Sequence, residues 1–153
     1  FGFYQRCCLL AMERIDGWEM RLDDFIKSRQ FTKFEWGVHD CALFACDAIE
    51  VITGIDVAVC FRHKYSTKDE AYQMLSEFSN GGLEETAELI TNEFDMKEIP
   101  RNYCGRGDVV LCNVLNEELP TLGIVGLTEK IYIAGTRNLQ VFDKSHGVRF
   151  WRV

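Results

Sequence analysis

A cysteine stands where a loop gives way to an apolar run in the segment FEWGVHDCALFACDAIEVITG, residues 34–54. Asp40 is a residue type that caps helix N-termini, so Cys41 is expected to be the first residue of a helix. Backbone N–H groups in a first turn have no partner inside the helix, and the helix dipole adds partial positive charge there. Both effects favour a thiolate, and the same N–H groups can bind an oxyanion. Cys41 is therefore a candidate nucleophile for acyl transfer.

The alternative interpretation treats Cys41 as a small apolar core residue, which is the common role of a free cysteine. Cys46 lies further into the same apolar run and is expected to be core. The three cysteines that have no helix-head context are interpreted as structural: Cys60, Cys104 and Cys112.

A nucleophilic cysteine needs a nearby base, and the chain has three histidines. His39 precedes Cys41 by two residues, so it either orients the loop through its ring nitrogens or serves as the base. His146 is in a turn before the last strand, and His63 is among basic residues on a loop. Asp40 is expected to act as the helix cap, although its charge opposes thiolate formation.

Four helical patterns come first in the chain, and the run around Cys41 is apolar on nearly all sides, which predicts a buried helix. After Pro100 the chain changes to short β-rich runs separated by turn residues. This order predicts an α+β fold. We expect one domain over residues 12–153 and an N-terminal extension over residues 1–11. The predicted helices cover residues 15–30, 41–53, 68–79 and 83–94, and the β-rich runs are 107–114, 121–127, 130–135, 139–142 and 147–153.

Composition narrows the functional classes. The net charge of −7 and the pI near 5.0 argue against nucleic acid or an anionic membrane as partner, since both need a basic surface. No apolar stretch is long enough to insert into a bilayer. Seven cysteines without a CxxC pair predict neither a disulfide framework nor a metal site, and we expect no cofactor. Such cysteine usage fits a reducing cytoplasm.

Two groups of residues carry a resemblance to a known family. The segments HDCALF, RGDVVL and TLGIVG resemble the NlpC family of papain-like cell-wall peptidases, which show D-C-x-x-F, then G-D before a strand, then H-hydrophobic-G-hydrophobic. The pattern W-G-x-H-D-C-x-x-F, followed by A-x-x-x-x-T-G-x-D, is similar to a phage and prophage branch of that superfamily. Its positions here are Trp36, Gly37, His39, Asp40, Cys41, Phe44, Ala48, Thr53, Gly54 and Asp56.

The resemblance implies a papain-like fold in which the cysteine helix packs on a C-terminal antiparallel sheet or open barrel. It implies Cys41 as the nucleophile and Asp108 as the support of a strand start. It also puts Thr121 at the position of the catalytic histidine, which leaves His39 as the substitute base.

Two hypotheses follow. The first is a cysteine hydrolase, a peptidase or amidase that acts on peptidoglycan peptides. The second is a catalytically inactive phage tail or assembly protein that binds a partner with the same cleft. Either protein would be located in the bacterial cytoplasm or in the virion.

Overall fold

The computed structural model describes residues 12–114 and 119–153, so the predicted extension over residues 1–11 lies outside the described part. Four α-helices precede six strands there, which confirms the predicted α+β class. The helices are α1 (Trp18–Arg29), α2 (Cys41–Thr53), α3 (Lys68–Ser79) and α4 (Leu83–Glu93). The strands are β1 (Lys97–Ile99), β2 (Val109–Cys112), β3 (Thr121–Val125), β4 (Ile131–Ala134), β5 (Leu139–Phe142) and β6 (Gly147–Arg152). Short 3₁₀ turns, η1 (Arg101–Tyr103) and η2 (Lys144–His146), precede β2 and β6.

The strands form one antiparallel sheet in the order β1-β6-β2-β3-β4-β5. Strand β1 was not expected from the sequence, because its three residues are mostly exposed and show no apolar alternation. It pairs with β6 at the edge of the sheet. Described helices are all too short or too polar to cross a membrane.

Strand β2 is buried on both faces, and its alternating side chains join two different clusters. Val109 and Leu111 pack in the larger core with the helices. Val110 and Cys112 point to the other face and pack in a second core. The sheet therefore separates a helix-covered core from a smaller core enclosed by its own strands.

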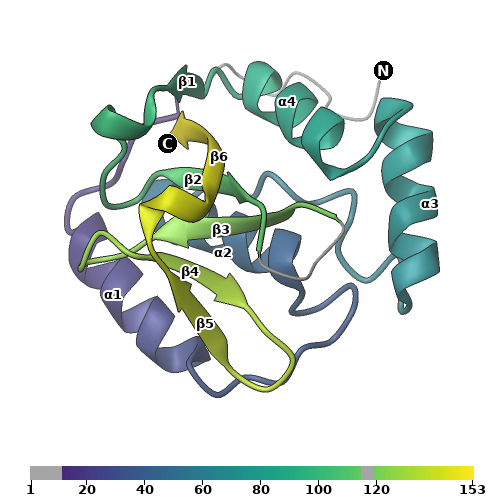
Figure 1. Ribbon diagram of the computed structural model, residues 1–153, viewed down its shortest axis with the longest axis horizontal. Helices are drawn as coiled ribbons and strands as arrows, with labels where there is room; N and C mark the ends of the chain where they lie inside the picture. Colours follow the sequence, from purple (N-terminus) through teal and green to yellow (C-terminus); the bar gives the residue numbers. More distant parts are fainter. Residues whose placement is uncertain (1–11, 115–118) are drawn as a thin grey trace.

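Helix α2 lies at the centre of the larger core, where α1 and β3 both contact it. The ring of Phe44 stacks on that of Phe25 in α1, with centroids 5.4 Å apart. Helix α2 ends at Gly54, whose φ of 76° is the left-handed conformation that favours glycine. Helices α3 and α4 pack on each other and lie away from β4 and β5 (Figure 1).

Asp108, the residue before β2, contacts residues near both ends of the described chain. Its buried carboxylate accepts from Arg14 Nη2 at 2.8 Å and from the Gly105 N–H at 2.9 Å, and Arg152 Nη2 lies 3.4 Å away. Arg14 also donates to the carbonyl of Val153. These contacts give Asp108 a structural role at the strand start.

Candidate functional site

The loop before α2 is fixed by the carboxylate of Asp40, which is 1% exposed. It accepts three hydrogen bonds: from Gly37 N at 3.0 Å, from Leu43 N at 2.9 Å and from the Tyr65 hydroxyl at 2.6 Å. The bond from Leu43 caps α2, as the sequence predicts. Burial, followed by the charge of Asp40, raises the pKa of Tyr65 well above its usual value. No local pattern pointed to Tyr65, because only the fold brings residue 65 to the helix head.

Residue 37 must be a glycine because it lies against the backbone of Tyr65. Its φ of 78° disfavours other residues, and a Cβ there would lie 2.1 Å from the Tyr65 carbonyl oxygen. The segment that contains Tyr65 thus packs directly on the loop before the cysteine.

Cys41 is the first residue of α2 and is partly exposed, as the sequence predicts for its place in the helix. The surroundings of its thiol oppose ionisation, however. Burial raises the pKa of Cys41 and the charge of Asp40 raises it further, whereas hydrogen bonding from the Thr121 side chain and from the Leu122 and Ala42 amides lowers it. The net direction of the pKa is upward, which differs from the lowering expected at a helix head. Desolvation outweighs the hydrogen bonding from Thr121, Leu122 and Ala42.

His39 lies on the α1 side of the loop and is 2% exposed. Its Nδ1 is 3.3 Å from Nη1 of Arg29, and its ring meets that of Phe44 edge-on. Because arginine only donates, Nδ1 must be the acceptor and Nε2 must carry the proton. Nε2 has no hydrogen-bond partner.

Neither ring nitrogen of His39 therefore hydrogen-bonds to the Cys41 sulfur. Burial, with the positive charge of Arg29, also lowers the pKa of His39. The lone pair that a general base needs is occupied by Arg29, so this geometry does not give His39 the role of base for Cys41.

The other histidines contact different groups. His146 Nδ1 lies 3.3 Å from the Asp143 carbonyl, and its ring packs beside Phe142. His63 is exposed and adopts a φ of 59°. Its backbone N–H donates to the Gly37 carbonyl.

Thr121 is the first residue of β3 and is the side chain from the sheet that acts on Cys41 by hydrogen bonding. It pairs with Cys112 across the strands. Burial raises the pKa of Cys112 to about 12, which agrees with the structural role expected for that cysteine. A threonine hydroxyl cannot take a proton from a thiol at neutral pH. The arrangement binds the sulfur but does not deprotonate it.

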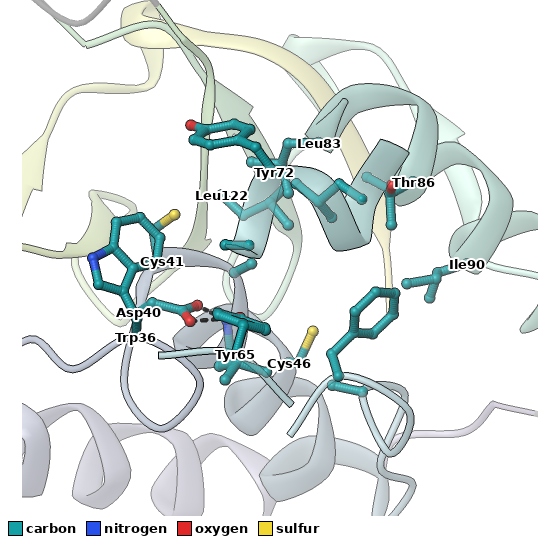
Figure 2. Close-up of a pocket in the computed structure, with 17 residues that line it drawn as sticks. Trp36, Asp40, Cys41, Cys46, Tyr65, Tyr72, Leu83, Thr86, Ile90 and Leu122 are labelled. Carbon is teal, nitrogen blue, oxygen red and sulfur yellow. Dashed lines mark hydrogen bonds between the residues drawn. The ribbon is translucent and has the colours of Figure 1, made fainter. Parts of the chain in front are cut away.

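An apolar pocket of about 80 Å³ opens beside Cys41. Figure 2 shows Cys41, Trp36 and Tyr72 toward one side of it and Cys46, Thr86 and Ile90 toward the other. Its walls come from the head of α2, the following loop, α3, α4 and β3. The remaining lining residues are Asp40, Ala42, Leu43, Ala58, Phe61, Tyr65, Ala71, Leu75, Leu83, Ala87 and Leu122. The apolar faces of residues 71–78 and 83–90 were visible in the sequence, but their meeting at Cys41 was not.

A set of ion pairs lies on the side of α2 that faces Arg29. Asp47 lies 2.6 Å from Arg62 Nη1 and 3.5 Å from Arg29 Nη1. Arg62 also binds Asp56 through Nε at 2.9 Å. Asp56, the last residue of the T-G-x-D part of the motif, is therefore explained by its bond to Arg62. Arg62 in turn has a structural role.

The described cysteines Cys41, Cys46, Cys104 and Cys112 carry free thiols. Within residues 12–114 and 119–153, His, Cys, Asp and Glu side chains do not form a group of three or more suited to a metal ion.

Fold and site together define an α+β domain whose cysteine heads a buried helix and faces the start of a sheet strand. The model of the family described as Domain of unknown function (DUF6950) matches residues 13–153, so the chain belongs to that family. A search of curated proteins found no match.

Proposed function

We propose that this chain is a papain-like domain of the NlpC type, from a phage or prophage, that binds a peptide at the head of α2 without cleaving it. One observation carries the proposal: among the described residues, no histidine hydrogen-bonds to the Cys41 sulfur. Thr121, which lowers the pKa of Cys41 by hydrogen bonding, is at the position where the resemblance puts a histidine, and His39 Nδ1 accepts from Arg29. A thiol with a raised pKa and no proton acceptor is a poor nucleophile at neutral pH.

The partner expected from the resemblance is a phage tail or assembly protein. The pocket supports such a role because the loop beside it is held by hydrogen bonds to Asp40. Asp40 ties Gly37, Leu43 and Tyr65 into one unit, and this unit forms one wall of the pocket. A wall that is already ordered loses little entropy when a ligand binds.

The second candidate is the cysteine hydrolase that cuts amide bonds in peptidoglycan stem peptides. It is favoured by the position of Cys41 at a helix head, where hydrogen bonding from the Leu122 and Ala42 amides lowers the pKa of the thiol. Those donors stabilise a thiolate once it forms.

Hydrolysis of stem peptides by the wild-type chain and by Cys41→Ser separates the two functions. We expect no cleavage above the level of the serine variant. Cleavage by the wild type that is lost in Cys41→Ser would sink the binding proposal.

A complementary variant restores the missing group. Thr121→His should lower the pKa of Cys41 and raise its alkylation rate at pH 7, because an imidazolium stabilises the thiolate. An alkylation rate unchanged from that of the wild type would show that residue 121 does not occupy the base position.

A further inference from the structure

Three polar side chains that line the pocket beside Cys41, those of Asp40, Tyr65 and Thr86, already have hydrogen-bond partners. Asp40 accepts three hydrogen bonds, and the Tyr65 hydroxyl donates to Asp40. The Thr86 hydroxyl donates to Ser79 Oγ at 2.9 Å. A charged or polar group that entered would lose its water without gaining partners from these side chains. The pocket therefore favours an uncharged, apolar group.

The size of the pocket limits that group further. A volume of about 80 Å³ exceeds that of a single water site, and an apolar cavity of this kind binds apolar groups rather than water. It is too small for a long acyl chain. Half-buried Trp36 and Tyr72 lie on the side of the pocket where Cys41 is (Figure 2).

We infer that the pocket receives one aliphatic side chain, of the leucine, isoleucine or valine class, from a peptide segment of a partner protein. The inference rests on the proposed function and names the chemistry that selects the ligand. A site for stem peptides would differ from this pocket, because the charged side chains of those peptides would need charged or polar partners inside it.

Two lining residues allow the pocket to be resized in opposite directions. Ala87 on α4 is buried, and Ala87→Leu fills the space. Leu75 on α3 is half-buried, and Leu75→Ala enlarges it. Leu89→Ala is the matched control, because Leu89 is on α4 but is 37% exposed and does not line the pocket.

The probes are N-acetyl amino-acid N-methylamides of leucine, valine, alanine, phenylalanine, glutamate and lysine. Binding is followed by methyl NMR of the pocket leucines and isoleucine, with thermal unfolding as the check that each variant folds. In the wild type we expect leucine to bind at least about tenfold more tightly than alanine, glutamate or lysine. Ala87→Leu should shift the preference toward alanine and valine, and Leu75→Ala toward phenylalanine. Leu89→Ala should leave it unchanged.

A preference for glutamate or lysine, or a leucine preference that neither resizing variant moves, would overturn this inference and leave non-catalytic peptide binding in place. Absence of binding by every probe at millimolar concentration would also overturn it. Cleavage of stem peptides that depends on Cys41 tests the proposed function separately.

Discussion

The first turn of α2 has an apolar pocket on one side and a group of polar and charged side chains on the other. On the pocket side, Cys41 is surrounded by apolar walls and by the Thr121 hydroxyl, and its pKa is raised. On the other side, His39, Arg29, Asp47 and Arg62 form a chain of polar contacts. Charged and titratable groups lie where they hold the loop in place, and none of these four lines the pocket. The ionisable groups on this side serve the fold, so a cysteine at a helix head does not by itself indicate catalysis.

Removing the Asp40 carboxylate should have the largest effect, because both sides of the head depend on it. Asp40→Ala leaves two buried backbone donors and the half-buried Tyr65 hydroxyl without their acceptor, and we expect a loss of about 3 kcal/mol in the free energy of unfolding. Urea denaturation measures it. Tyr65→Phe removes one of the three bonds and should cost roughly half as much. Equal stability of Asp40→Ala and the wild type would show that the carboxylate does not organise the loop.

Breaking the ion pairs tests the polar side alone. Arg62→Met leaves the mostly buried Asp47 without its nearest cation, and we expect a loss of about 2 kcal/mol. Lys97→Met is the control, since its pair with Asp95 is exposed and should contribute less than about 0.5 kcal/mol. The same denaturation series measures both. Similar losses in the two variants would contradict a special role for Arg62.

The pH dependence of stability should report on His39. Its pKa in the folded state is lowered by burial and by Arg29, against the opposing charges of Asp47 and Asp40. The unfolded chain therefore binds the proton more readily, so stability is full above the unfolded pKa of about 6.5 and falls as the pH drops below it.

Unfolding measured between neutral and mildly acidic pH should show this decline in the wild type and a smaller one in His39→Asn. His63→Asn changes an exposed histidine and should keep the wild-type slope. A wild-type slope in His39→Asn would assign the proton to another group.

The smallest change is expected on the pocket side. Thr121→Val removes the side-chain hydrogen bond that lowers the pKa of Cys41, so the thiol should titrate at still higher pH. Alkylation rate against pH measures it, with Cys41→Ser to identify the signal. Faster alkylation of Thr121→Val at neutral pH would contradict the contact.

Local patterns predicted much of the fold because they depend on neighbours in the chain. Asp40 caps α2 and Gly54 ends it, as their residue types indicate. The β-rich runs after Pro100 became strands of one sheet. Strand β1 was missed because pairing with β6, and not burial of an alternating face, makes it a strand.

The candidate site was predictable only in part. Proximity in sequence made His39 the substitute base, but its ring turns to Arg29 on another helix. Tyr65, 25 residues from Asp40 along the chain, was not predicted at all.

The sequence by itself determined where the cysteine helix begins, because capping and apolar periodicity are local properties. Tertiary structure alone decided that the thiol is desolvated, that His39 Nδ1 accepts a hydrogen bond from Arg29, and that α3 and α4 close a pocket over Cys41. A pKa and a cavity depend on which distant side chains displace water around a group, and the order of residues along the chain does not specify that directly.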